Sequence, residues 1–299
     1  MSGKSGGLSV LLERPRPSTL QQFIKEPCIF LAKKLYKWRW IIGFDPIKPI
    51  AIVCISDTHN SQPSDIPPGE VLIHAGDITQ TGTLKEIQTS LDWINSLPHP
   101  HKVLIAGNHD ILLDHTDPRA DPVANASINW GNITYLDSES TTISCTNGRE
   151  LKIYGSPLTP RHGNWAFQYP RNQNVWHHKI PAGTDILITH GPPKGHLDAG
   201  YFGCKHLLDE VWRAKPRLHV FGHVHDGHGM EWIQFDGLQR AYENIVIAGG
   251  GLWNLSRVVF EFLRAHSTPI KESRVLFVNP AIAGGLRDEQ RRPPITVHV

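Results

Sequence analysis

Short apolar runs, separated by polar segments that contain glycine and proline, recur along most of the chain. Continuous apolar runs are typical of strands that are covered on both faces of a sheet. They predict strands at residues 50–55, 71–75, 102–106, 151–154, 185–189, 218–221, 245–248 and 275–278.

Several intervening segments show helical periodicity instead. Apolar residues at positions 84, 87, 91 and 94 form one stripe, which begins after a Thr83-x-x-Glu86 capping pattern. Further helices are predicted near residues 205–213 and 252–265. Short strands alternating with helices favour the α/β class, and we expect a four-layer α/β/β/α sandwich of two mixed sheets flanked by helices. One doubly wound sheet would show the same periodicity.

The first 49 residues differ from the rest of the chain in charge. They contain nine of the 30 Lys and Arg residues but only three of the 28 Asp and Glu residues. We therefore divide the chain into a basic extension, residues 1–49, and one domain, residues 50–299. Residues 1–19 are rich in Gly, Ser, Pro and Arg and are predicted to be disordered.

Residues 20–42 are predicted to form an amphipathic helix. Its apolar positions at helical spacing are Leu31, Leu35, Trp38 and Ile42, with lysines between them. A basic helix that carries a tryptophan is typical of peripheral contact with an anionic membrane. The alternative interpretation is a helix that docks on the body of the protein.

Overall composition narrows the class of protein. The net charge of +2 excludes a strongly basic nucleic-acid binder, so no specific nucleic-acid partner is expected. No apolar run reaches 18 residues, so no spanning helix is expected. The four cysteines are widely separated, which is typical of reduced thiols, and we expect a cytoplasmic protein that is either free or peripherally membrane-bound.

Polar side chains follow five of the predicted strands, directly after the strand ends. In α/β sheets, binding sites form at this carboxyl edge. The candidate metal ligands at these positions are Asp57, His59, Asp77, Asn108, His190, His223 and His225.

The chemistry of these side chains indicates the type of metal. Oxygen and imidazole donors without thiolate favour two divalent or mixed-valence ions, such as Mn, Fe or Zn. The seven ligands form two sets of four if Asp77 is shared. Two such ions about 3.5–4 Å apart bind the attacking and leaving oxygens of a phosphoryl group. The site would carry net positive charge and attract a phosphate ester.

The order of these residues resembles a known signature. Asp-x-His at 57–59, Gly-Asp at 76–77, Gly-Asn-His-Asp at 107–110, His190 and Gly-His-x-His at 222–225 resemble the calcineurin-like metallophosphoesterase superfamily. Asn164-Trp-Ala-Phe and Ile188-Thr-His-Gly-Pro-Pro resemble its narrower metallophosphoesterase-domain branch, which is similar to class III cyclic nucleotide phosphodiesterases. This likeness extends over roughly residues 50–299.

The resemblance implies roles for individual residues. It places Asp57, His59, Asp77 and His225 on one metal, and Asp77, Asn108, His190 and His223 on the other. It implies that a metal-bridging hydroxide attacks phosphorus while His109 assists the leaving group and Asp110 orients His109. The chain retains the first histidine of Gly-His-x-His, which favours activity, and it lacks the arginine that follows Gly-Asp in Ser/Thr protein phosphatases.

The segment 156–183 is the predicted substrate region. It is rich in aromatic and basic residues, and we expect Arg161 and Trp165 to contact the substrate, together with Asn279 after the last strand. The alternative is a loop that its aromatics pin to the body. The leading hypothesis is a hydrolase of small phosphodiesters resembling cyclic nucleotides. The second is a low-activity nucleotide-binding or scaffold protein that reaches a membrane or partner through its basic extension.

Overall fold

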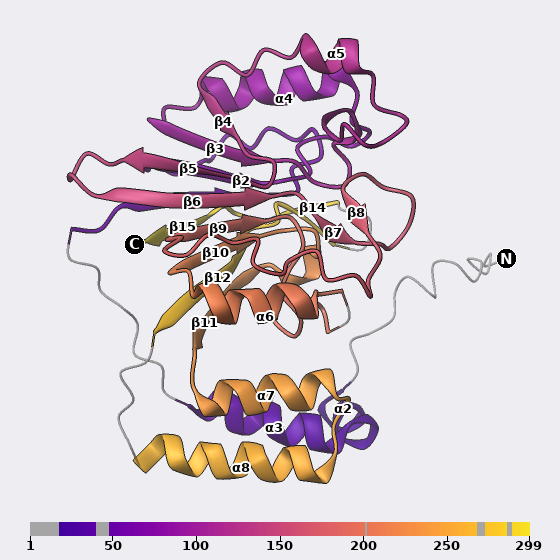
Figure 1. The fold of residues 1–299 in the computed structure, drawn as a ribbon, viewed down its shortest axis with the longest axis vertical. Helices are drawn as coiled ribbons and strands as arrows, with labels where there is room; N and C mark the ends of the chain where they lie inside the picture. The colour runs from indigo at the N-terminus through magenta and orange to yellow at the C-terminus, as the bar shows by residue number, and fades with distance from the viewer. Residues whose placement is uncertain (1–17, 40–47, 201, 268–272, 286–288) are drawn as a thin grey trace, which may run out of the picture. The chain divides into compact units, whose positions relative to one another are not determined.

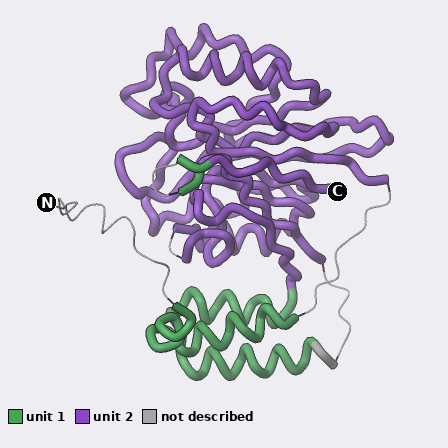
Figure 2. The backbone as a smooth tube through the Cα atoms, turned by 180° about the vertical axis from the view of Figure 1, so that it is seen from behind, with its two compact units in different colours: residues 1–40, 236–271, 284–290 green, residues 41–235, 272–283, 291–299 purple. Residues whose placement is uncertain are grey.

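The computed structural model describes residues 18–39, 48–200, 202–267, 273–285 and 289–299. The expectations for residues 1–17 and 40–47, including the place of Ile42, lie outside these ranges. The chain divides into two compact units, shown in Figure 2. We call residues 1–40, 236–271 and 284–290 the helical unit, and residues 41–235, 272–283 and 291–299 the sandwich unit.

The sandwich unit contains two mixed sheets. The first has the strand order β15 (Ile295–His298), β1 (Ala51–Ile55), β2 (Val71–Ala75), β3 (His101–Ile105) and β4 (Ile133–Tyr135). The second has the order β11 (Gly229–Gln234), β12 (Arg274–Asn279), β10 (Leu218–Phe221), β9 (Ile186–Thr189), β6 (Glu150–Ser156) and β5 (Glu139–Ser144). The α-helices of this unit are α4 (Leu84–Ser96), α5 (Pro122–Ala126) and α6 (Lys205–Ala214). Shorter elements are β7 (Thr159–Pro160), β8 (Gln168–Tyr169), β13 (Ala283–Gly284), β14 (Gln290–Arg291) and the 3₁₀ turns Ile111–Leu113 and His225–Gly227.

Three apolar layers hold the sandwich together. Ile73 of the first sheet and Ile153 and Val220 of the second belong to one fully buried cluster between the sheets. A second cluster lies beneath α4 and contains Leu91, and a third lies beneath α6 and contains Val211. Figure 1 shows α4 and α5 outside the first sheet and α6 outside the second. The predicted four-layer α/β/β/α sandwich is confirmed, and a single doubly wound sheet is excluded.

Strand direction brings the polar strand ends together. β1, β2 and β3 are parallel neighbours in the first sheet, and β9 and β10 are parallel neighbours in the second. Parallel neighbours end at the same edge of a sheet, so the loops that follow these five strands emerge together.

The helical unit contains α2 (Thr19–Lys25), α3 (Pro27–Trp38), α7 (Gly237–Ile247) and α8 (Leu252–Ser267). Its core is formed by apolar residues of α3, α7 and α8, namely Ile29, Ala32, Tyr36, Leu238, Ala241, Tyr242, Ile245 and Val258. The rings of Tyr36 and Tyr242 stack at 3.9 Å, and the Tyr36 hydroxyl donates a hydrogen bond of 2.6 Å to Gln239. α3 is therefore a core element of this unit, and the boundary expected after residue 49 does not coincide with a compact unit.

The helix predicted over residues 20–42 is wrong in its extent and its orientation. Pro27 starts a new helix, because it lacks the N–H that would continue the hydrogen bonding of α2. The buried face of α3 carries Ile29, Ala32 and Tyr36, whereas Leu31 and Trp38 are 42% and 72% exposed. Of the predicted stripe, Leu35 does pack against the core, so the docked face is rotated from the predicted one and overlaps it at Leu35.

The strand predicted at residues 245–248 is also wrong. Residues 245–247 end α7, whose buried residues Leu238, Ala241 and Ile245 recur at helical spacing. The short apolar run is the end of a longer helical stripe. The other predicted strands and helices are confirmed within a few residues.

Candidate metal centre

Five loops at the carboxyl edges of the two sheets carry the candidate ligands. Four of these ligands have a positive backbone φ: Asp57 (50°), His59 (43°), Asp77 (55°) and His223 (66°). This left-handed region is uncommon for residues other than glycine, and such strain clusters at functional sites. The turns therefore aim these side chains into the site at a conformational cost.

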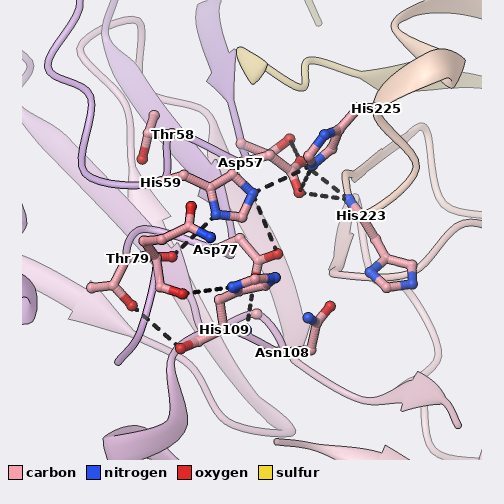
Figure 3. A network of polar contacts seen from close by, with 12 residues as sticks. Asp57, Thr58, His59, Asp77, Thr79, Asn108, His109, His223 and His225 are labelled. Carbon is pink, nitrogen blue, oxygen red and sulfur yellow. Dashed lines mark hydrogen bonds and ion pairs between the residues drawn. The ribbon is translucent and has the colours of Figure 1, made fainter. Parts of the chain in front are cut away.

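Asp57, His59 and His225 form the first group of potential ligands (Figure 3). His225 Nε2 lies 3.4 Å from Asp57 Oδ1, and the Nε2 atoms of His225 and His59 lie 3.4 Å apart. The ligand atoms of the three residues lie within 4.8 Å of one another. This spacing suits three ligands of a single ion.

Asp77, Asn108 and His190 form the second group. His190 Nε2 lies 3.3 Å from Asp77 Oδ2 and 3.0 Å from Asn108 Oδ1. The same Asp77 oxygen lies 3.8 Å from His59 Nε2 of the first group, and the His223 ring lies 5.1 Å from the His190 ring. Asp77 is therefore located where it can serve both groups.

The carboxylates are held by the loops around them. The Asp57 carboxylate accepts hydrogen bonds from the His223 N–H at 3.0 and 3.1 Å and from the Ser56 hydroxyl at 2.5 Å. Asp77 Oδ1 accepts one from the His109 N–H at 2.8 Å, which leaves Oδ2 facing the site. These contacts orient both carboxylates before any ion binds.

Opposite charges control the protonation of the site. Burial raises the pKa of both aspartates, but neighbouring histidines outweigh it and hold the pKa of Asp57 and of Asp77 well below the usual range. Burial likewise opposes the charged form of His190, but Asp77 outweighs it and raises the pKa of His190 to about 9. Without a cation, a protonated imidazole thus balances the carboxylate charge.

Two histidines are oriented as metal ligands usually are. His59 Nδ1 lies 3.2 Å from the Thr79 carbonyl, and His190 Nδ1 lies 2.9 Å from the Ala75 carbonyl. A carbonyl only accepts, so each Nδ1 carries the hydrogen and each Nε2 faces the site. Ligating histidines commonly donate their other N–H in this way.

His109 lies beside this cluster. Its Nδ1 lies 2.7 Å from the Gln80 carbonyl, and its ring contacts His59 edge-on at 4.7 Å. The indole of Trp165 stacks on the same ring at 4.2 Å with an interplanar angle of 28°. The Gln80 carbonyl fixes the hydrogen on Nδ1, so Nε2 is the nitrogen that can exchange a proton with a ligand.

We expected Asp110 to orient His109, but in the structure its carboxylate binds the backbone of two neighbouring loops. Its buried carboxylate accepts hydrogen bonds from the N–H groups of Ile78, Thr79 and Gly107 at 3.2, 3.0 and 2.8 Å, and from the Thr79 hydroxyl at 2.7 Å. Asp110 thus ties the loop of Asp77 to the loop of Asn108. Burial and the nearby Asp77 raise its pKa to about 6.

The three predicted substrate contacts have different surroundings. Trp165 is 37% exposed and lies on His109, as a substrate contact requires. Arg161 is exposed, and its carbonyl accepts a hydrogen bond from Arg171. The buried Asn279 amide donates to the Val224 carbonyl at 2.9 Å, so it supports the loop between two histidine ligands rather than facing a substrate.

Two further residues lie next to the site: one belongs to the basic groups of the predicted substrate segment but was not singled out, and the other was not predicted. The His162 ring lies 4.5 Å from the His223 ring. In the sequence, its position beside Arg161 in the aromatic segment could have indicated that it lies near the site. The Arg292 guanidinium donates to the carbonyl of His225 and lies 3.8 Å from Asp226. Arg292 is remote in sequence from every motif, so only the fold reveals it. It borders a cavity of about 580 Å³, which is lined by residues 61–65 and 291–294.

Comparison with known proteins identifies the family. The family model of the calcineurin-like phosphoesterases matches residues 50–227, more than half of the chain. The chain belongs to the calcineurin-like phosphoesterase family. The members of this family are metal-dependent phosphoric ester hydrolases, and the predicted resemblance is confirmed.

Several relatives show similarity beyond the motifs. Metallophosphoesterase domain-containing protein 1 of Homo sapiens is 39% identical over 205 residues, which cover 60% of this chain and 61% of that protein. The UPF0046 protein C25E10.12 of Caenorhabditis elegans is 38% identical over 215 residues, which cover 62% and 76%. A protein of Emericella nidulans named probable rhamnogalacturonate lyase C is 42% identical over 254 residues, which cover 84% of this chain but 24% of that protein. The chain thus spans about a quarter of the length of the Emericella nidulans protein and about three fifths of the length of the human protein. The human and Caenorhabditis elegans relatives support the metallophosphoesterase-domain branch.

The residues fit the two metal ions that the family implies. Carboxylate, imidazole and amide oxygen donors converge without a thiolate, and carbonyl groups hold Nδ1–H of His59 and His190 so that each Nε2 faces the site. No helix among the described residues is long and apolar enough to cross a membrane.

Proposed function

We propose that this chain is a dinuclear metal-dependent phosphoesterase that hydrolyses small phosphodiesters, with cyclic nucleotides as the model substrate class. The observation that carries the proposal is the position of Asp77 Oδ2, 3.3 Å from His190 of one ligand group and 3.8 Å from His59 of the other. One carboxylate oxygen at the junction of two ligand groups is what a shared pair of ions requires.

The two groups would each hold one ion of the Mn, Fe or Zn type. Asp57, His59, Asp77 and His225 would bind the first, and Asp77, Asn108, His190 and His223 would bind the second. When bound, such ions neutralise phosphate oxygens and activate water for attack on phosphorus. The chain contributes the fixed positions of these ligands and the groups that surround the substrate.

His109 would act on the leaving group. The Gln80 carbonyl retains the hydrogen on Nδ1, so a protonated ring presents Nε2–H to the departing oxygen. Trp165 stacks on the ring and limits its rotation. Proton donation to an alkoxide by a positioned imidazole typically contributes about 10²–10⁴ in rate.

The surroundings favour a substrate with a second group beyond the phosphate. The partly exposed indole of Trp165 offers a face on which a base or another planar group can stack. This exposed indole face supports a substrate that carries a planar group in addition to its phosphate, rather than inorganic phosphate alone.

Turnover of bis(p-nitrophenyl) phosphate with added Mn²⁺ tests the proposal. His109→Ala should lower kcat by at least about a hundredfold, and Asp77→Asn should abolish turnover. The matched controls are His115→Ala and Asp92→Asn, which change exposed residues of the same types and should leave kcat unchanged. Metal binding by the wild type without turnover of diesters or monoesters would instead support the nucleotide-binding or scaffold hypothesis.

A further inference from the structure

The helical unit exposes an unusual amount of apolar surface. Among the residues that the structure describes, ten of the fourteen exposed large apolar side chains belong to this unit. They lie on three of its helices: Leu20, Phe23 and Ile24 on α2, Leu31 and Trp38 on α3, and Leu252, Trp253, Val259, Phe260 and Leu263 on α8. Apolar side chains that stay exposed in this number on a few neighbouring helices indicate an interaction site.

α8 has two apolar sides. Leu255, Val258 and Phe262 recur at helical spacing and pack in the core of the helical unit. The other large apolar residues of α8 are exposed, and Trp253 and Phe260 are 76% and 64% exposed. A helix that needs only to pack in its own unit has one apolar stripe. The second stripe of α8, which we define as Leu252, Trp253, Val259 and Phe260, therefore serves another contact.

α3 adds positive charge to exposed apolar residues. Its outward residues Leu31 and Trp38 are interleaved with a lysine row, Lys33, Lys34 and Lys37, all of them exposed. Glu26 is the only acidic residue between positions 18 and 39. On α8, the one acidic residue, Glu261, forms an ion pair with Arg264 at 3.0 Å. The exposed faces of both helices thus combine apolar or cationic groups and lack uncompensated negative charge.

We propose that the helical unit docks on the surface of an anionic phospholipid membrane, with the second stripe of α8 inserted at the headgroup boundary and the lysine row of α3 on the lipid phosphates. Tryptophan favours this boundary because its ring is apolar and its N–H is polar. Lysine side chains lay their stems along apolar surface while their ammonium groups reach the headgroups. The contact expected for residues 20–42 alone is thereby extended to α8, a segment more than 200 positions away in the chain.

Charge favours a membrane over a second copy of this chain. In a symmetric pair of chains, the same patch lies on both sides of the interface, so two surfaces of equal positive charge would come together and repel. An anionic lipid surface satisfies the same lysines and accepts the apolar side chains. Attraction to such a surface contributes about fivefold in affinity for each lysine near it.

Sedimentation of the full-length protein with vesicles tests the proposal. We compare vesicles of pure phosphatidylcholine with vesicles that contain about 30% phosphatidylserine. Wild-type protein should bind the phosphatidylserine vesicles, and its binding should weaken with added salt and in pure phosphatidylcholine. This comparison needs no variant and is independent of phosphoesterase activity.

Two variants separate the charge from the apolar contact. Replacing Lys33, Lys34 and Lys37 with glutamine should weaken vesicle binding about a hundredfold, and the double variant Trp253→Ser/Phe260→Ser should weaken it at least about tenfold. The matched controls replace exposed residues of the sandwich unit, namely Lys85, Lys152 and Lys179 with glutamine, and Val123 and Met230 with serine. The controls should bind like the wild type, and all changed positions are exposed, so melting temperatures should stay close to that of the wild type.

Three outcomes overturn the proposal. The first is that wild-type protein fails to sediment with phosphatidylserine vesicles. The second is that the lysine variant and its control bind equally well. The third is a dimer in light scattering that Trp253→Ser/Phe260→Ser dissociates while vesicle binding is absent, which would assign the patch to a second copy of the chain.

Discussion

Gly222 separates strand β10 from the ligand His223 and passes directly over the carboxylate of Asp57. A Cβ atom at residue 222 would lie 2.2 Å from Asp57 Oδ2 and 2.5 Å from Ser56 Oγ. Carbon and oxygen atoms that are not bonded need about 3.3 Å. Gly222→Ala therefore forces the Asp57 carboxylate to move by about 1 Å.

The size of the effect follows from what holds Asp57. Its carboxylate accepts hydrogen bonds from the His223 N–H at 3.0 and 3.1 Å. A shift of about 1 Å would separate donor and acceptor beyond hydrogen-bonding distance. Crowding of the core and loss of a hydrogen bond to a charged group together should lower the free energy of unfolding by about 3 kcal/mol. Metal ligands tolerate about 0.2 Å of displacement, so affinity for the first ion should fall at least about a hundredfold.

Competition with a fluorescent chelator measures the affinity for Mn²⁺ or Zn²⁺, and denaturant unfolding measures stability. The control is Gly148→Ala, which also adds a Cβ but meets no atom within 4 Å; unlike Gly222, Gly148 has a positive φ (82°). It should cost about 1 kcal/mol of backbone strain and leave metal affinity unchanged. Wild-type metal affinity in Gly222→Ala would refute the assignment of Asp57 as a ligand.

Three further predictions follow from the pKa values and contacts. Because Asp77 outweighs burial and raises the pKa of His190 to about 9, this ring must lose a proton when a metal binds at pH 7. Calorimetry in several buffers should detect about one proton released, and affinity should rise about tenfold per pH unit up to pH 9; no proton release would contradict this. Trp165→Ala should lower kcat about fivefold at unchanged metal content, because His109 loses a stacking partner; an unchanged kcat would remove that role. Burial opposes the charge of Glu86, but hydrogen bonds from Thr81 and Asn60 lower its pKa to about 2. Ionised Glu86 therefore stabilises the folded protein fully at pH values above 4.5, the pKa of this carboxyl in the unfolded chain. This stabilisation is lost as the pH falls toward 2. Glu86→Ala should cost about 1 kcal/mol at pH 7 and progressively less in acid, as measured by unfolding at each pH.

The convergence of the candidate ligands was predictable because each one follows a local signal. Asp57, Asp77 and Asn108 come directly after apolar strands, and parallel strands must end at a common edge. Their pairing into two groups needed the resemblance, because spacing along the chain does not specify which loops meet across two sheets. The structure shows the groups through distances between residues up to 166 positions apart, such as His59 and His225.

Residues whose role depends on long-range hydrogen bonds were not predictable. Asp110 is adjacent to His109 in sequence, which favoured a role in orienting it, but its carboxylate points to the backbone of residues 78–79. Asn279 was assigned to the substrate because it follows a strand, yet its amide is used by Val224. In both cases the partner comes from a distant loop that no local pattern identifies.

Aromatic content alone also did not decide whether the segment 156–183 contacts the substrate or is a loop that its aromatic residues pin to the body. Phe167, Tyr169 and Trp176 are buried and pin the segment to the body, whereas Trp165 is partly exposed and lies on His109. The interpretation as a pinned loop is confirmed for these three buried residues, and the substrate contact of Trp165 stays a prediction. The helical unit was missed for a related reason, since its core joins α3 to α7 and α8 across about 200 intervening residues.

Metal stoichiometry tests the central claim most directly. Elemental analysis of the wild-type protein after equilibration with Mn²⁺ or Zn²⁺ should find two ions per chain, and Asp77→Asn should retain at most one, because Asp77 Oδ2 lies 3.3 Å from His190 of one ligand group and 3.8 Å from His59 of the other. Wild-type protein that binds fewer than two ions, or an Asp77→Asn variant that still binds two with unchanged affinity, would contradict a paired centre built around this carboxylate.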